Sequence, residues 1–199
     1  MKAKIAVCAS GLGSNFASIV QASREGRLAA DIVGLIANRP AIGALDKAKN
    51  LQIPAVTLAP QQFASRELWD SAMCSQLGDW GADWVVLAGF LTLIGTQVLL
   101  HYPQKVVNIH PALLPKFGGR GMYGDHVHRA VLAAGEAWTG VTIHLVDHIY
   151  DRGRIVAQEN VRVENADTVE TLARRVKAIE GSFYPKVLND LVTGRITTS

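Results

Sequence analysis

The chain has 199 residues, a length typical of one compact domain. Hydrophobic residues make up 49% of it and charged residues 19%, so it has enough apolar surface for a large core, which excludes an intrinsically disordered protein. The formal net charge is only +3, and neither half of the chain carries a basic excess of the kind that predicts a nucleic-acid partner.

Three features concern the compartment. Cys8 and Cys74 lack the spacing of a redox or zinc motif, so we expect two free thiols in a reducing cytoplasm. The N-terminal residues run directly into a strand-like segment without the apolar region of a signal peptide. The longest apolar tract, residues 84–100, is interrupted by glycine and polar residues, which favours a strand and a helix over a membrane span. We expect a soluble, cytoplasmic protein without a membrane partner.

Short β-branched runs alternate with amphipathic stretches in the first part of the chain. This alternation predicts an α/β fold with a doubly wound, mainly parallel sheet. The expected strands are residues 4–9, 31–37, 55–58, 84–89 and 106–109, and the expected helices are residues 14–24, 42–51, 65–77 and 95–101.

The pattern changes after residue 115. A glycine-rich stretch, residues 116–124, precedes a predicted helix over residues 124–134. Residues 140–148 and 154–163 are expected to form a C-terminal hairpin attached to the sheet. Residues 167–191 have apolar positions at helical spacing and predict a long closing helix capped by Asp167. We interpret residues 1–199 as one domain.

The motif Ser10-Gly11-Leu12-Gly13-Ser14-Asn15 lies between the first predicted strand and the first predicted helix. Exposed backbone amides and the helix dipole make such a turn suitable for a phosphate. It is neither a dinucleotide fingerprint, because Phe16 replaces the third glycine, nor a P-loop, because no Gly-Lys-Ser/Thr follows. The alternative is a tight turn without a ligand.

Asn108 and His110 end a predicted central strand and alternate onto the same side of it. Active sites of open α/β sheets lie outside the carboxyl ends of the strands. An amide that donates to an oxyanion and an imidazole that moves a proton would together suit acyl transfer. The alternative is a pair of residues that only make turn hydrogen bonds.

Asp151 lies two residues before Gly153, where a predicted strand enters a loop. It is either a catalytic carboxylate or an Asx-turn residue. The histidine pairs at positions 126/128 and 144/148 also suggest a metal site, but no HExxH motif or thiolate set accompanies them. We therefore predict no metal.

Together these motifs resemble the folate-dependent phosphoribosylglycinamide formyltransferase family over nearly the whole chain. The resemblance rests on Gly11-Leu12-Gly13-Ser14-Asn15, on Leu87-Ala88-Gly89-Phe90, and most specifically on Asn108-Ile109-His110-Pro111-Ala112-Leu113-Leu114-Pro115. Gly140-Val141-Thr142-Ile143 and Tyr150-Asp151-Arg152-Gly153 complete it. It implies the formyltransferase fold, with a Rossmann-like N-terminal half.

The resemblance also implies roles for individual residues. The catalytic set would be Asn108, His110 and Asp151. Residues 1–110 would form the ribotide phosphate-binding half, and residues 111–199 the folate-binding and closing half. The ribotide would contact Gly11, Leu12, Gly13, Ser14, Asn15 and Glu180. The folate would contact Leu91, Thr92, Leu93, Ile94, Val98, Val146, Asp147, His148 and Asp151, with Arg66 near its glutamate tail.

The implied reaction transfers a formyl group from 10-formyltetrahydrofolate, a co-substrate, to glycinamide ribonucleotide in purine biosynthesis, by a monomer or homodimer. The chain departs from the family's usual residues at Thr92, Leu145, His148 and Arg154, and its loop 118–125 is longer than in some members. The alternatives are a formyltetrahydrofolate hydrolase, a formyltransferase acting on an aminoacyl-tRNA or amino sugar, and a ribotide- or folate-binding module that is not an enzyme.

Overall fold

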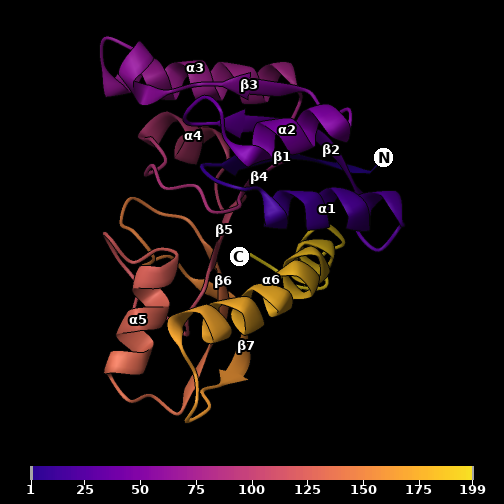
Figure 1. Ribbon diagram of the computed structural model, residues 1–199. Helices are drawn as coiled ribbons and strands as arrows, with labels where there is room; N and C mark the ends of the chain where they lie inside the picture. Colours follow the sequence, from indigo (N-terminus) through magenta and orange to yellow (C-terminus); the bar gives the residue numbers. More distant parts are fainter. Residues whose placement is uncertain (1, 199) are drawn as a thin grey trace.

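Seven strands form one sheet in the order β3-β2-β1-β4-β5-β6-β7 (Figure 1). The computed structural model describes residues 2–198. The first five strands are parallel to one another, and the last two run antiparallel to their neighbours. Their bounds are β1 Ala3–Ala9, β2 Ala30–Ala37, β3 Ala55–Thr57, β4 Trp84–Leu87, β5 Val106–His110, β6 Trp138–Leu145 and β7 Ile155–Arg162.

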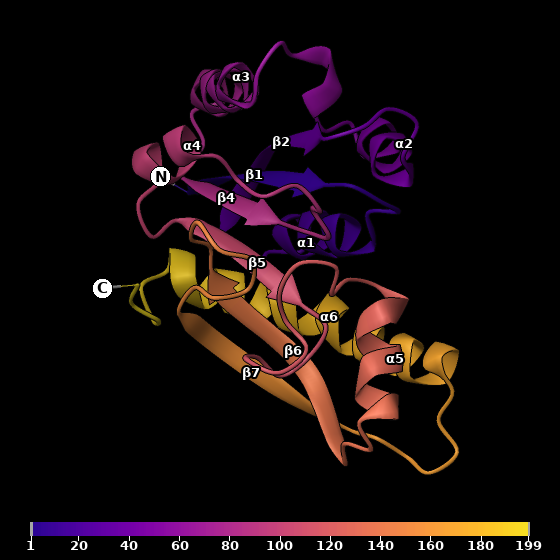
Figure 2. The same cartoon turned by 90° about the vertical axis from the view of Figure 1, so that its left-hand side faces the viewer.

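Helices cover both faces of the sheet, whose strands follow one another from β2 to β7 in Figure 2. One hydrophobic cluster packs α1 Ser14–Arg24, α2 Gly43–Asn50, α5 Asp125–Ala133 and α6 Val169–Val192 on one face. A second cluster packs α3 Arg66–Asp79 and α4 Thr96–His101 on the other face. The predicted doubly wound, mainly parallel α/β fold is confirmed.

Strand β1 shows how the sequence specifies the two layers. Ile5 and Val7 pack into the cluster under α1 and α6, whereas Ala6 and Cys8 pack into the cluster under α3 and α4. Both faces of a central parallel strand are buried, so its sequence is an uninterrupted apolar run. Cys8 is a buried free thiol, and burial raises its pKa.

The order of the strands fixes where a ligand can enter. Chain connections from β1 lead outward to β2 on one side, and β4 occupies the other side of β1. The loops that follow β1 and β4 therefore diverge and leave a crevice at the carboxyl ends of these strands. Residues 10–13 and 88–95 flank this crevice.

Two predicted boundaries were wrong in an informative way. Strand β6 ends at Leu145 and not at residue 148, because the ladder with β7 shifts register at Ile143/His144 and the chain then turns away. The cap of α6 is Thr168, whose hydroxyl accepts the N–H of Thr171, and not Asp167. A short 3₁₀ helix, Pro60–Gln62, was not predicted. The other predicted elements are present with ends shifted by at most two residues.

Tyr184 joins α6 to the centre of the sheet. Its hydroxyl lies 3.0 Å from the carbonyl oxygen of Leu87 and 3.1 Å from that of Val107, on the adjacent strands β4 and β5. Burial raises the pKa of the phenol, so the hydroxyl keeps its proton and can donate. This contact joins the last residue of β4 to the second residue of β5.

We predict that Tyr184→Phe lowers the free energy of unfolding by about 1–2 kcal/mol, because buried carbonyl groups lose a donor. Urea denaturation of the two proteins measures this difference. Tyr123→Phe is the matched control, since that side chain is 47% exposed, and it should change stability by less than about 0.5 kcal/mol. Equal midpoints for wild type and Tyr184→Phe would show that the Tyr184 hydroxyl contributes nothing.

Candidate active site

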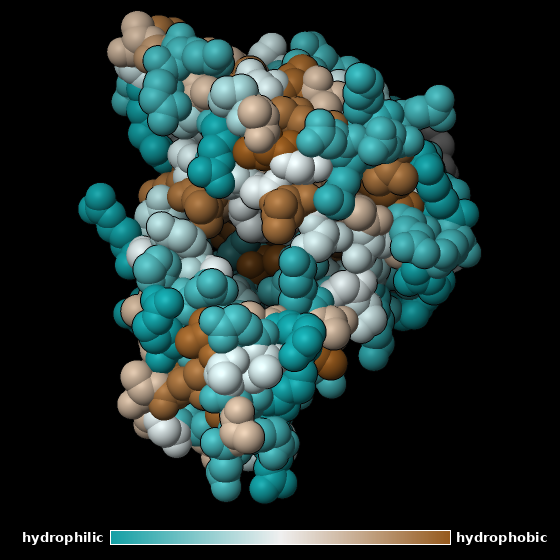
Figure 3. All heavy atoms as spheres, in the orientation of Figure 1, coloured by the Kyte–Doolittle hydropathy of each residue, from teal (hydrophilic) through white to brown (hydrophobic). Residues whose placement is uncertain are grey.

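A cavity of about 980 Å³ opens at the crevice between β1 and β4. Figure 3 shows this face hollowed near its centre, between the N-terminal elements and α5 and α6, with apolar residues in and around the hollow. The loops after β1, β4 and β5 form part of the wall. Loop 119–125, segment 144–151 and the first half of α6 complete it.

The glycine-rich turn forms one end of the cavity and leads into α1. Gly13 has a left-handed backbone (φ 72°), and a Cβ placed there would lie 2.7 Å from Ala44 Cα. Only glycine satisfies both constraints. Gly11 to Asn15 all line the cavity; residues 11–13 precede α1, and Ser14 and Asn15 begin its first turn. The turn therefore has the geometry of an anion site.

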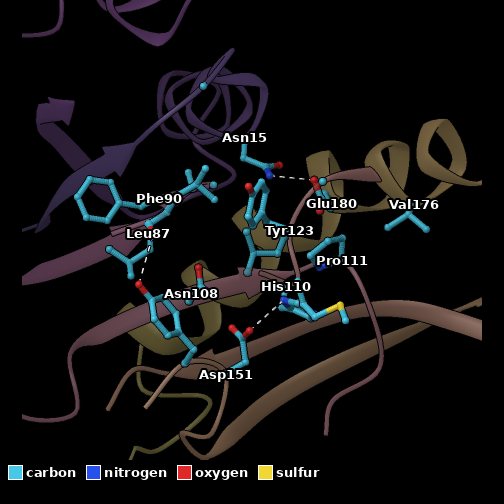
Figure 4. Close-up of a pocket in the computed structure, with 18 of the residues that line it drawn as sticks. Asn15, Leu87, Phe90, Asn108, His110, Pro111, Tyr123, Asp151, Val176 and Glu180 are labelled. Atoms are coloured by element: carbon cyan, nitrogen blue, oxygen red, sulfur yellow. Dashed lines mark hydrogen bonds and ion pairs between the residues drawn. The ribbon is translucent and has the colours of Figure 1, made fainter. Parts of the chain in front are cut away.

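Asn15 and Glu180 meet across this end of the cavity (Figure 4). The amide nitrogen of Asn15 donates to Glu180 Oε2 at 2.9 Å. Burial raises the pKa of Glu180, and the hydrogen bond from Asn15 and the charge of Lys177 oppose that rise. A carboxylate held here beside the anion site can accept hydrogen bonds from hydroxyl groups.

Asn108 pairs with His144 across β5 and β6. The Nδ1 atom of His144 lies 2.8 Å from the carbonyl oxygen of Leu145, which can only accept, so Nδ1 carries a hydrogen. In the neutral ring Nε2 is then an acceptor, and Asn108 Nδ2 donates to it at 3.0 Å. This contact fixes the amide of Asn108 and leaves its second N–H for the cavity.

His110 lies beside Asn108 at the end of β5, and both of its ring nitrogens have partners. Nε2 donates to the carbonyl oxygen of Phe117 at 2.8 Å. Nδ1 lies 3.6 Å from Asp151 Oδ2. Because only 4% of its side chain is exposed, burial lowers the pKa of His110, while the Asp151 carboxylate and the Phe117 carbonyl oppose this shift.

Asp151 contacts both His110 and His144, and Figure 4 shows its carboxylate facing His110. Its Oδ1 lies 3.5 Å from His144 Nε2, and its Oδ2 accepts the N–H of Gly119 at 2.8 Å. Burial alone would raise the pKa of this carboxyl, but the contacts with His144, His110 and Gly119 outweigh it, so the pKa is lowered. The ring nitrogens that face the carboxylate carry a hydrogen only when His144 and His110 are protonated, because the hydrogen of each neutral ring lies on the other nitrogen. Asp151 is thus a buried carboxylate that stays ionised beside His110.

The backbone of Asp151 is itself unusual. Its φ of 56° is left-handed, a conformation that costs a non-glycine residue free energy and persists only where surrounding contacts enforce it. The contacts of the carboxylate described above supply that enforcement. The strain therefore favours a role for Asp151 in the site over that of a solvated turn residue.

Segment 91–94 also lines the cavity. Ser10 Oγ accepts the N–H of Leu91 at 2.9 Å, and Asn38 Nδ2 donates to Thr92 Oγ1 at 2.8 Å. Of the predicted folate residues, those that line the cavity are Leu91, Thr92, Leu93, Ile94, Val146 and Asp151.

Four predicted folate residues are not among those that line the cavity. For Val98 the prediction is wrong, and for the other three the contact with folate stays a prediction. Val98 faces the core between α3, α4 and the sheet and is fully buried. Asp147 and His148 follow the end of β6 at Leu145 and are not among the residues that line the cavity. Arg66 lies outside the lining, where its guanidinium donates to the carbonyl oxygen of Leu93 and stacks 5.5 Å from the ring centroid of Trp69.

Sequence reasoning also missed residues that the fold brings to the site. His144 could have been found, because an antiparallel hairpin next to β5 places some residue opposite Asn108. Among the others, Phe90 and Tyr150 stand in motifs quoted above, and the rest carry no local signal, since loops and α6 bring them to the site. These other residues are Phe90, Arg120, Met122, Tyr123, His128, Ile149, Tyr150, Arg174 and Lys177.

Among residues 2–198, no group of three or more His, Cys, Asp or Glu side chains is arranged to hold a metal ion. Within the same range, no helix combines the length and the apolar character needed to cross a bilayer.

Comparisons with known proteins agree with this geometry. A family model described as formyl transferase matches residues 3–188. The chain belongs to the formyl transferase family. Within this formyl transferase family the chain is 36% identical to a phosphoribosylglycinamide formyltransferase of known structure from Bacillus halodurans, with 96% of each chain covered and a TM-score of 0.90.

Two further relatives bear the same type of name. A glycinamide ribonucleotide transformylase of known structure from Symbiobacterium toebii is 34% identical, with 98% of this chain and 89% of that chain covered and a TM-score of 0.92. A chloroplastic phosphoribosylglycinamide formyltransferase from Arabidopsis thaliana is 43% identical over 97% of this chain. This formyl transferase spans 66% of the length of that plant protein.

For this formyl transferase we predict that Asp151→Asn lowers the pKa of His110 further, because the carboxylate is the main group opposing the effect of burial. NMR titration of the histidine ring signals measures the shift. Asp147→Asn is the control, since Asp147 lies in the same loop but accepts only the nearby N–H of Ile149. A His110 pKa that stays constant or rises in Asp151→Asn would contradict the assignment.

Proposed function

We propose that this formyl transferase transfers the formyl group of 10-formyltetrahydrofolate to the amine of glycinamide ribonucleotide, a step of purine biosynthesis. The observation that carries the proposal is one cavity that holds both an anion-binding turn, residues 11–15, and the Asn108, His110 and Asp151 set. Ligand cavities are typically about 300–1,000 Å³, so a volume of about 980 Å³ is suitable for two substrates side by side.

The acceptor binds at the α1 end. Its phosphate lies on the amides of residues 11–15, and Glu180 accepts hydrogen bonds from its ribose hydroxyls. Lys177, one turn before Glu180 on α6, lies on the same wall and adds a positive charge near the phosphate. The donor lies between segment 91–94 and residues 146–151, so that its formyl group meets the acceptor amine in front of Asn108.

The reaction begins when the amine of the acceptor attacks the formyl carbon of the donor. A C–N bond forms, and the carbonyl electrons move to oxygen as a tetrahedral oxyanion. The free N–H of Asn108 and the N–H of His110 donate to this oxyanion. In the free protein His110 donates to Phe117, so this hydrogen bond is exchanged when the formyl oxygen arrives.

Collapse of the intermediate completes the transfer. The attacking nitrogen loses a proton, and N10 of the folate gains one as its bond to the formyl carbon breaks. Asp151 stabilises the protonated imidazole of His110 and orients the water through which this proton passes. The products are the formylated ribotide and tetrahydrofolate.

Two other functions make different demands on the same cavity. A formyltetrahydrofolate hydrolase would use water as the acceptor and would not need the anion-binding turn. A binding module would not need Asp151 to be strained and ionised between two histidines. Both features favour the transferase.

The cytoplasmic location, the absence of a nucleic-acid or membrane partner and the monomeric or homodimeric state stay predictions. The location is supported by the two free cysteines. The plant relative is named as a chloroplastic protein.

The decisive experiment follows tetrahydrofolate release by absorbance with and without purified ribotide. We expect release that depends on the ribotide, and His110→Ala should lower it about 10²–10⁴-fold while calorimetry still detects ribotide binding. His101→Ala is the control, since this residue lies on α4 outside the cavity and should leave the rate unchanged. Release without ribotide would favour the hydrolase, and no release would favour a binding module.

A further inference from the structure

Segment 91–93 is irregular, and side chains from four other parts of the chain hold it. Ser10 and Asn38 bind it from the β1 and β2 side, and Arg66 binds it from α3. The fourth is Tyr150, whose hydroxyl accepts the N–H of Leu93 at 3.1 Å. Tyr150 belongs to the loop on the opposite wall of the cavity, next to Asp151.

The same hydroxyl also lies 3.5 Å from the carbonyl oxygen of Leu91, in position to donate to it. One O–H group thus pairs with a main-chain donor and a main-chain acceptor two residues apart. Leu91, Leu93 and Tyr150 all line the cavity, so this bridge joins its two walls. A flat ring inserted between these walls would meet the bridge.

Without the Tyr150 hydroxyl, the N–H of Leu93 and the C=O of Leu91 would be free to bind one type of ligand. An N–H beside a C=O forms a donor–acceptor pair, and the edge of a pteridine carries ring nitrogens that accept beside amino or ring N–H groups that donate. The Tyr150 hydroxyl, which both accepts and donates, satisfies the same pair. It therefore occupies the place of such an edge.

We propose that Tyr150 determines the affinity of the folate subsite: its hydroxyl occupies the N–H of Leu93 and the C=O of Leu91 in the free protein, and the pteridine ring of the donor displaces it. This inference rests on the proposed function, which supplies the folate. The new element is that Tyr150 competes with the folate for the same main-chain groups.

The displacement does not disturb the neighbouring carboxylate. Asp151 is held by Gly119, His144 and His110, whereas the bonds of the Tyr150 hydroxyl go to Leu93 and Leu91. Rotation of the Tyr150 side chain therefore breaks its bonds to segment 91–93 and leaves the Asp151 contacts in place. Donor binding and proton transfer thus use adjacent residues that move independently.

The test is the variant Tyr150→Phe, which keeps the ring and removes the competing hydroxyl. Folic acid binding, measured by calorimetry, should become about threefold to tenfold tighter, the range expected for one net hydrogen bond. The KM of the formyl donor should fall by a similar factor, and the affinity for the ribotide should stay the same. Tyr102→Phe is the control and should leave the affinity for folic acid unchanged, because that residue follows α4 and does not line the cavity.

A weaker or unchanged affinity of Tyr150→Phe for folic acid would overturn the inference, since the hydroxyl would then help the ligand or ignore it. If the wild-type protein releases tetrahydrofolate but Tyr150→Phe does not bind folic acid more tightly, only this inference is overturned. A wild-type protein that neither binds folic acid nor releases tetrahydrofolate overturns the proposed function instead.

The Leu93 amide gives a second measurement that does not depend on turnover. In wild type its hydrogen exchange should be slow without ligand, because Tyr150 covers it, and in Tyr150→Phe it should be faster. Folic acid should protect this amide in both proteins. An amide that exchanges equally fast in the two ligand-free proteins would show that the bridge does not form in solution and would overturn the inference.

Discussion

The arrangement of the site depends on one carboxylate. Asp151 lies 3.6 Å from His110 and 3.5 Å from His144, with only 10% of its side chain exposed. A buried charge of this kind is stable only if it is paired and hydrogen-bonded. Three features pair the Asp151 carboxylate and give it hydrogen bonds. They are the register of β6 against β5, the bond to Gly119 and the left-handed turn at residue 151.

This constraint couples the fold to the chemistry. The parallel part of the sheet brings Asn108 and His110 to the crevice, and the antiparallel hairpin brings His144 and Asp151 against them. Tyr184 ties β4 and β5 together from α6, which also carries Glu180. The acceptor end and the proton-transfer end of the cavity are therefore fixed by the same long helix and the same pair of strands.

Much of this arrangement could be predicted from the sequence, because it depends on local pattern. Apolar runs and glycine turns located the sheet, and the polar residues that end β5 marked the crevice. The features that could not be predicted depend on contacts between residues far apart in the sequence. The end of β6 is set by its ladder with β7, Val98 is directed inward by the packing of α4, and Tyr150 reaches segment 91–93 only across the cavity.

The central claim is that Asp151 acts through His110 in proton transfer. The most direct measurement is kcat from about pH 5 to 9 for wild type and Asp151→Asn, a range around the ordinary histidine pKa of about 6.5. Loss of the carboxylate should lower kcat about 10²–10⁴-fold and move the His110 limb of the profile to lower pH, while the melting temperature changes little. A variant with the wild-type rate and the wild-type profile would show that Asp151 is only a turn residue.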